Sequence, residues 1–165
     1  MSIRFNIDEV FVMAIKIEEN GAAFYRRAAE LHAGGDFETT LKDLADMEDE
    51  HKKIFTEMRE QVGEDEKLEQ AYDPFNEAIL YLNSMADYHG GEGSQSAADK
   101  LTGDETILDI VRTGIELEKK SILYYLGLKD LVPQRLGTEK MDKIIVEEKK
   151  HVVQLSKILT QEKKK

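Results

Sequence analysis

The 165-residue sequence contains no cysteine and no tryptophan, and it contains only two prolines. The missing cysteine excludes disulfides, thiolate zinc sites and iron–sulfur clusters within the chain. The low proline content, together with 35% charged and 41% hydrophobic residues, is typical of long amphipathic helices rather than of short strands and turns. The sequence therefore predicts an all-α protein.

Basic residues are also scarce relative to acidic ones, with 23 lysines and arginines against 34 aspartates and glutamates. A net charge of -11 argues against a nucleic-acid partner, whose phosphates require a dominant basic surface. The first 16 residues carry Asp8 and Glu9 where a signal peptide has no acidic residues, and no apolar stretch is long enough to span a membrane. We expect a cytoplasmic protein without a membrane partner, folded as one domain over residues 1–165.

Two helices are expected in the first part of the chain. Asn6, with Glu9 three residues later, has the pattern of a capping box, and apolar residues then recur at spacings of three and four, which predicts a helix over about 7–32. A glycine pair at 34–35 can end this helix, and Asp36 is expected to cap the next one. The short link predicts an antiparallel hairpin.

A long connector follows, over about 63–103. Within it, an aspartate and a proline predict a short helix over about 73–88, and the Gly-rich residues 89–96 predict a loop. A connection of this length can cross the whole bundle, so the second and third long helices are expected to run parallel.

The last part of the chain predicts a second hairpin. Thr102 and Glu105 have the pattern of a capping box for the third helix, which is expected to end near Leu131, and Thr138 is expected to begin the fourth. Four helices of this length, each about 38 Å long, have the proportions of a four-helix bundle.

Two Glu-x-x-His turns recur at an offset of 100 residues, and each is preceded by a glutamate and a tyrosine seven residues apart. The eight residues are Glu18, Tyr25, Glu48, His51, Glu118, Tyr125, Glu148 and His151. Each of the four glutamates lies in the apolar stripe of its helix, with hydrophobic residues three or four positions away. All four carboxylates are therefore expected to face the core.

Four buried carboxylates require compensation, because each unpaired one costs several kcal/mol and a typical domain is stable by only about 5–15 kcal/mol. No basic residue lies at the centre of the stripes, and Lys52 at the edge can extend outward. Two divalent ions would balance four negative charges, with one histidine completing each shell. Oxygen-rich ligation with one imidazole per metal favours iron or manganese over structural zinc, although zinc or copper would also bind.

These residues resemble the ferritin-like carboxylate di-iron family, and within it the rubrerythrins. The string Ile-Lys-Ile-Glu-Glu-Asn-Gly-Ala-Ala-Phe-Tyr at 15–25 is similar to their first-helix motif, and the resemblance covers the chain apart from the connector. It implies a ferritin-like bundle of two hairpins in which Glu18 and Glu118 each bind one metal, Glu48 and Glu148 bridge the two, and His51 and His151 each bind one.

The same resemblance implies that Tyr25 and Tyr125 are hydrogen-bond donors to the ligands, although both also fit as ordinary core aromatics. Glu147 is a candidate to orient a histidine, whereas Glu19 and Glu50 are expected on solvated faces. Two iron ions are the implied cofactor.

The implied activity is reduction of hydrogen peroxide or oxygen, with a role in oxidative stress and a homodimeric state. Rubrerythrins usually carry a cysteine-ligated rubredoxin domain, so this cysteine-free chain would take electrons from a separate donor such as a rubredoxin. Two alternatives stay open: an iron-handling ferroxidase or storage protein, and a non-enzymatic helical protein that metal merely stabilises.

Overall fold

A computed structural model describes residues 6–64, 80–81 and 96–164. These residues form four long helices and one short 3-10 helix. The elements are α1 (Ile7–Leu31), α2 (Glu38–Glu60), α5 (Ile107–Lys129), η1 (Gln134–Leu136) and α6 (Thr138–Glu162). The predicted all-α class is confirmed, and each observed long helix matches a predicted one to within a few residues.

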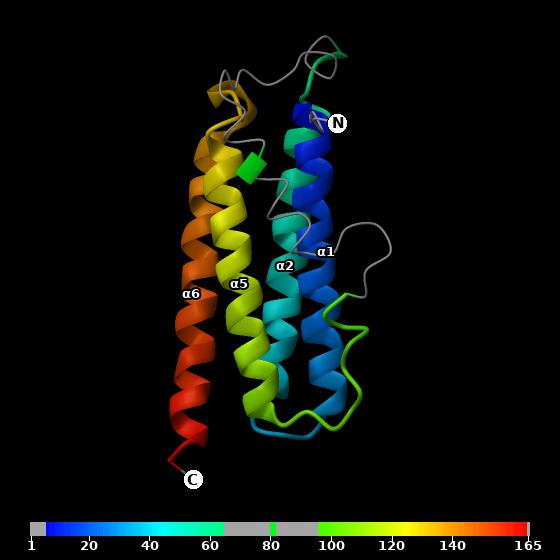
Figure 1. Ribbon diagram of the computed structural model, residues 1–165, viewed down its shortest axis with the longest axis vertical. Coiled ribbons are helices and arrows are strands. Elements are labelled where there is room, and N and C mark those ends of the chain that lie inside the picture. The colour runs from blue at the N-terminus through cyan, green and yellow to red at the C-terminus, as the bar shows by residue number, and fades with distance from the viewer. Residues whose placement is uncertain (1–5, 65–79, 82–95, 165) are drawn as a thin grey trace.

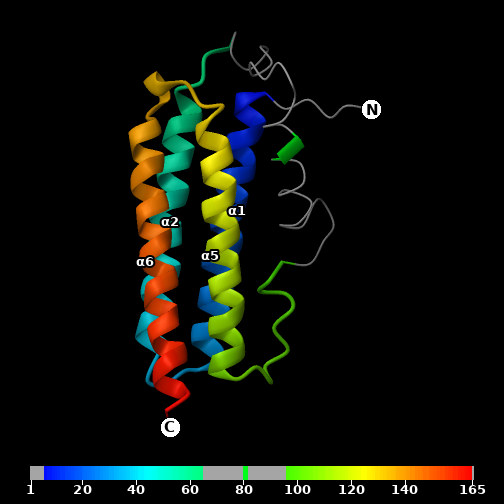
Figure 2. The same ribbon diagram turned by 60° about the vertical axis from the view of Figure 1, so that its left-hand side comes forward.

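The four helices lie alongside one another as a bundle of two antiparallel hairpins (Figure 1). Helix α1 packs mainly against α2, and α5 packs mainly against α6; the hairpins meet where α1 contacts α5 and α2 contacts α6. Helices α2 and α5 run in the same direction, as the length of the connector predicted (Figures 1 and 2). This arrangement brings one face of all four helices to a common axis.

The capping box at the start of α1 is confirmed. The Asn6 side chain accepts from the Glu9 amide, and the Glu9 carboxylate accepts from the Asn6 amide, both at 2.9 Å. The predicted cap of α2 is wrong: Phe37 occupies the N-cap position and makes no side-chain cap hydrogen bond. Instead, Glu38 reaches back and accepts from the Gly34 amide, in a link where Gly34 has a left-handed φ of 77°.

The predicted start of the third helix is also wrong, by four residues. Thr106 and Asp109 form the capping box of α5, so the helix begins at Ile107. The Glu105 carboxylate does accept from the Thr102 and Gly103 amides, but these bonds close a turn in which Gly103 has a φ of 103°. The left-handed backbone at Gly103 interrupts a helix. The capping box predicted from Thr102 and Glu105 therefore cannot begin α5.

Most of the predicted connecting helix at 73–88 and of the loop at 89–96 lies outside the described residues. Leu80 and Tyr81 are described and are helical. The Tyr81 hydroxyl donates to the Leu123 carbonyl at 2.8 Å, which places this point of the connector against α5. No helix among the described residues is long and apolar enough to cross a membrane.

The core consists of two apolar clusters. One is built around Phe11, Phe55, Tyr124 and Tyr125, and the other around Phe24, Leu41, Ile110 and Leu155. Along α1 the boundary between them falls between Ile17 and Phe24, where Glu18 is fully buried. The bundle is therefore apolar above and below a polar layer at its middle.

The cap of α5 gives a test of the corrected helix start. Replacing Thr106 with alanine removes the side-chain acceptor of a capping box and should lower the free energy of unfolding by about 1 kcal/mol. The control, Thr39→Ala, removes the same atoms from an exposed site inside the first turn of α2 and should change stability by less than about 0.5 kcal/mol. Chemical denaturation of the metal-free protein measures both; equal effects would contradict the assigned cap.

Candidate metal centre

The structure brings all six residues of the two repeated turns and their paired glutamates into the polar layer. Glu18 comes from α1, Glu48 and His51 from α2, Glu118 from α5, and Glu148 and His151 from α6. None of them is more than 3% exposed. The expectation that the four carboxylates face the core is therefore confirmed.

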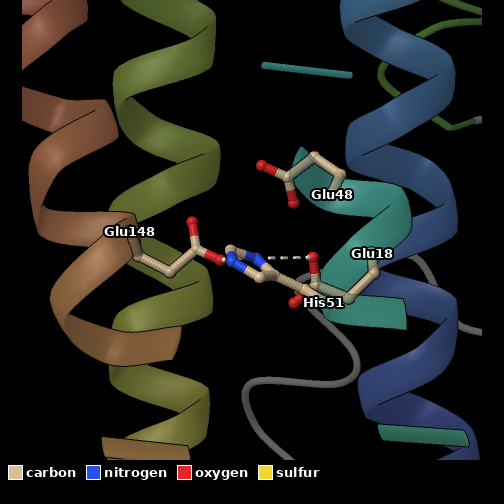
Figure 3. Close-up of side chains that lie close together, drawn as sticks. All are labelled: Glu18, Glu48, His51 and Glu148. Carbon is tan, nitrogen blue, oxygen red and sulfur yellow. Dashed lines mark ion pairs between the residues drawn. The ribbon is translucent and has the colours of Figure 1, made fainter. Parts of the chain in front are cut away.

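Around His51, the ligand atoms converge from three helices. The Nδ1 atom of His51 lies 2.8 Å from Glu148 Oε1 and 3.6 Å from Glu18 Oε2. Figure 3 shows the imidazole ring lying between these two carboxylates, with Glu48 nearby on the same helix as the histidine. Nδ1 is thus the ring nitrogen directed at the acidic centre.

His151 has a matching environment. Its Nδ1 lies 3.2 Å from Glu148 Oε2, 3.4 Å from Glu48 Oε1 and 3.6 Å from Glu118 Oε1. The two imidazole rings face each other nearly in parallel, with centroids 5.8 Å apart. The offset of 100 residues in sequence therefore corresponds to an approximate two-fold symmetry of the site.

Two overlapping groups of side chains could each hold one ion, with their ligand atoms all within 4.8 Å of one another. The groups are Glu18, Glu48, His51 and Glu148, and Glu48, Glu118, Glu148 and His151. Glu48 and Glu148 belong to both groups. Each ion would meet three glutamates and one histidine, and two carboxylates would be shared.

Several of the buried atoms that face the centre make close charged contacts but no well-oriented hydrogen bond with any of the described residues. These atoms are Glu18 Oε2, Glu48 Oε1, His51 Nδ1 and Glu148 Oε1, all of them buried. A buried polar atom without a partner costs about 1–3 kcal/mol, and more when it is charged. Divalent ions bound by oxygen and imidazole nitrogen would satisfy these atoms, so the donor set fits a two-metal centre.

Without metal, the histidines take up the compensating charge. Burial acts to lower the pKa of His51, but the adjacent Glu148 and Glu18 outweigh it and raise the pKa to about 11. Burial likewise opposes protonation of His151, yet Glu118, Glu148 and Glu48 raise its pKa to about 12. Both rings are imidazolium at neutral pH in the metal-free protein.

The carboxylates are perturbed in different directions. Burial and the charge of Glu148 raise the pKa of Glu118 to about 8. Burial, with the repulsion of neighbouring carboxylates, also raises the pKa values of Glu18 and Glu48. Burial acts to raise the pKa of Glu148 as well, but hydrogen bonds with Glu118 and the two histidines lower it. The metal-free site therefore holds protons on carboxylates as well as on imidazoles.

The two tyrosines hydrogen-bond across the bundle. The Tyr25 hydroxyl donates to Glu118 Oε1, and the Tyr125 hydroxyl donates to Glu18 Oε1. Burial and the nearby carboxylates raise the pKa values of both phenols well above 10, so both stay protonated. Each tyrosine thus fixes the glutamate of the other hairpin, a crossed pairing that the sequence did not reveal.

Two glycines, to which the sequence reasoning gave no role, make room for these side chains. A Cβ on Gly21 would lie 3.1 Å from Glu48 Oε2, and one on Gly114 would lie 3.0 Å from the Tyr25 hydroxyl oxygen. Both glycines are on the inward face of their helices, next to the glutamates of α1 and α5. Their position next to a candidate ligand was the sequence feature that could have identified them.

Comparison with known proteins agrees with this geometry. Residues 9–87 match the rubrerythrin family model. A crystal structure from Thermotoga maritima, of a protein described as ferritin-like and diiron-carboxylate, matches with a TM-score of 0.71 and 28% identity, over 98% of this chain and 99% of that one. The chain therefore has a ferritin-like fold, and its first half is similar to the rubrerythrin family. None of the curated proteins matches its sequence.

The two histidines of the site are supported differently. His51 Nε2 lies 2.9 Å from the carboxylate of Glu147, a residue that is 40% exposed at the surface of α6. The equivalent position on α2 is Met47, and His151 Nε2 is buried without a hydrogen-bond partner among the described residues. Since a partner on the second ring nitrogen orients a metal-binding histidine, the halves of the site are chemically unequal.

Metal binding to this ferritin-like site should release protons and tighten as pH rises. The imidazole pKa values of about 11 and 12 mean that both rings must lose a proton before nitrogen can bind a metal at pH 7, and Glu118 must lose one too. Titration calorimetry with Mn²⁺ in buffers of different ionisation enthalpy should give at least two protons released when the site fills. Affinity that is independent of pH between 6 and 8 would contradict this ligand set.

Removing the support of one histidine should affect the two ions unequally. Glu147→Ala should weaken one of two bound ions by about 10- to 100-fold and leave the other nearly unchanged, because only His51 loses its partner. Glu147→Gln keeps an acceptor and should restore most of the affinity. Glu60→Ala, at an exposed position on α2, is the control. Calorimetry with Mn²⁺ measures both affinities, and equal weakening of the two would contradict the inequality.

Proposed function

We propose that this protein is a di-iron oxidoreductase that reduces hydrogen peroxide, or oxygen, as its ferrous ions are oxidised. The observation that supports this most directly is the set of six buried ligand candidates, divided into two groups that share Glu48 and Glu148. Paired metals bridged by carboxylates are suited to two-electron reduction of a small oxidant. The rubrerythrin match over residues 9–87 supports the same class of chemistry.

Iron, rather than manganese or zinc, is the metal we propose. The donor set has four carboxylates and two imidazoles, with no thiolate, which suits a redox-active divalent ion of intermediate hardness. When bound, two ferrous ions would supply two electrons, which with two protons reduce hydrogen peroxide to two waters. The chain has no cysteine, so the electrons that restore the ferrous state would come from a separate donor protein.

The side chains of the chain would set the conditions for this reaction. Glu48 and Glu148 would hold the two ions close together, while Glu18 and Glu118 would each bind one. The Tyr25 hydroxyl donates to Glu118, and the Tyr125 hydroxyl donates to Glu18. These hydrogen bonds fix which oxygen of each carboxylate remains available to an ion. Burial of the whole set excludes bulk water, which strengthens every electrostatic interaction in the site.

Stopped-flow absorption tests the proposal. Metal-free protein loaded anaerobically with two ferrous ions per chain should develop the absorption of oxidised di-iron after peroxide is added, at a rate well above that of ferrous iron in buffer. The double variant Glu48→Ala/His51→Ala removes a glutamate that belongs to both ligand groups and a histidine that belongs to one of them. It should lose this reaction. Glu60→Ala should retain it.

Other outcomes would overturn the proposal. If the protein binds two ferrous ions but oxidises them no faster than buffer does, and metal only raises its melting temperature, the centre is structural. If iron accumulates far beyond two ions per chain, the protein is a storage protein. Metal analysis of protein purified without added metal would show whether iron is the natural occupant.

A further inference from the structure

The internal repeat differs at one position beside the histidines of the site. Glu147 of α6 corresponds to Met47 of α2 at the offset of 100 residues. The carboxylate of Glu147 lies 2.9 Å from His51 Nε2, whereas His151 Nε2 is buried and has no hydrogen-bond partner among the described residues. Because the site has approximate two-fold symmetry, Met47 lies where His151 lacks an acceptor. A thioether sulfur is only a weak acceptor, so Met47 does not supply the hydrogen bond that Glu147 supplies to the other ring.

Met47 is also accessible to a small molecule from solvent. It is partly exposed, and it belongs to neither of the two apolar clusters of the core. On its outer side it lines a surface hollow together with charged residues of α2, among them Asp46 and Glu50. The contact of Glu147 with His51 shows that the same position of the repeat also reaches a histidine of the site. Met47 therefore connects the surface with the edge of the metal centre.

The other described methionines are less available to an oxidant. Met58 and Met141 are fully buried, and Met13 is partly buried but packs against the apolar cluster around Phe11. A methionine sulfur reacts with peroxide only where the peroxide can reach it. Among the described methionines, Met47 is therefore the one that we expect to react first.

We propose that Met47 is an oxidation site through which hydrogen peroxide strengthens the metal centre. The sulfur takes one oxygen atom from the peroxide to become a sulfoxide: an S–O bond forms as the O–O bond breaks. The sulfur loses two electrons, and the second peroxide oxygen leaves as water with both protons. The new sulfoxide oxygen is a hydrogen-bond acceptor at the position that corresponds to Glu147. It would accept from Nε2–H of His151, because Nδ1 of this ring faces the acidic centre.

This modification would make the two halves of the centre alike. In the unmodified protein only His51 has an acceptor that orients its ring, and a partner of this kind changes metal affinity by about 10- to 100-fold. The ion bound through His151 is therefore the weaker one, and oxidation of Met47 should strengthen it by about this factor. The inference rests on the proposed function in one respect, which is that the protein meets peroxide. Exposure to this substrate would then help the protein to retain its second ion.

The position of Met47 makes a sulfoxide compatible with the fold. A sulfoxide is more polar than a thioether and disrupts an apolar core when it forms there. Met47 lies outside both apolar clusters, so its new oxygen would meet water or an imidazole N–H rather than hydrocarbon. Methionine sulfoxide reductases convert the sulfoxide back to the thioether, which makes the change reversible.

Mass spectrometry and calorimetry on the metal-free protein test the proposal. A limited amount of hydrogen peroxide should add one oxygen atom to the peptide that contains Met47 before it modifies those with Met13, Met58 or Met141. Titration with Mn²⁺ should then show that the weaker of two bound ions has become about tenfold or more tighter, while the stronger one is unchanged. Treatment with methionine sulfoxide reductase should restore the original affinity.

Three variants separate the sulfoxide from other effects of peroxide. Met47→Leu has no sulfur and should keep two unequal Mn²⁺ affinities before and after peroxide. Met47→Gln has an amide oxygen as an acceptor, so its weaker ion should be tight without any peroxide. Met13→Leu removes the other partly buried methionine of the described helices and is the matched control, which should respond as wild type does.

Circular dichroism checks that every protein stays folded. The proposal is wrong if Met47 stays unoxidised while Met13 reacts, or if the oxidised protein binds both ions as before or more weakly. It is also wrong if wild type binds its two ions equally, or if Met47→Leu responds to peroxide as wild type does. These measurements use Mn²⁺ and need no turnover, so their failure would leave the proposed oxidoreductase function untouched. A failure of the stopped-flow test would likewise not change the mass or the affinities measured here.

Discussion

The structure depends on the burial of four carboxylates at the centre of one helical bundle. A single unpaired buried carboxylate costs several kcal/mol, so four together would exceed the stability of a typical domain. In the metal-free protein, protons provide the compensation: both imidazoles are charged, and carboxylates including Glu118 retain protons. Divalent ions would replace these protons at the same residues. The site is thus held together in both states by positive charge, supplied either by protons or by metal.

The packing around the site follows from this constraint. Apolar clusters on either side keep water out, which strengthens the attraction between the charged groups and also makes each missing partner more costly. The hydroxyls of Tyr25 and Tyr125 each donate a hydrogen bond to a glutamate of the opposite hairpin, Glu118 and Glu18 respectively. This crossing ties the hairpins together where they otherwise touch mainly through α1 with α5 and α2 with α6. The missing Cβ at Gly114 leaves the space that one of these hydroxyls occupies.

The sequence predicted the helices and the converging residues because both depend on local periodicity. A glutamate within an apolar stripe must face the core, whatever the rest of the fold does. The errors arose where two local patterns compete: Thr102 with Glu105 and Thr106 with Asp109 are both plausible caps, and only the backbone at Gly103 decides between them. The crossed tyrosine bonds were beyond sequence reasoning because they depend on which helices are neighbours, a property of the assembled bundle.

The repeat also shows which positions the fold constrains. At the offset of 100 residues the buried ligand candidates are identical, whereas Met47 replaces Glu147 at the edge of the site and lysines replace acids at the surface. The interior cannot vary independently in the two hairpins, because each carboxylate contacts groups from both. Exposed charges make only surface ion pairs, which contribute little to stability, so the hairpins are free to acquire opposite charges there. Approximate symmetry inside the bundle is therefore compatible with two unequal histidines and with an outer surface that is acidic on one helix and basic on the next.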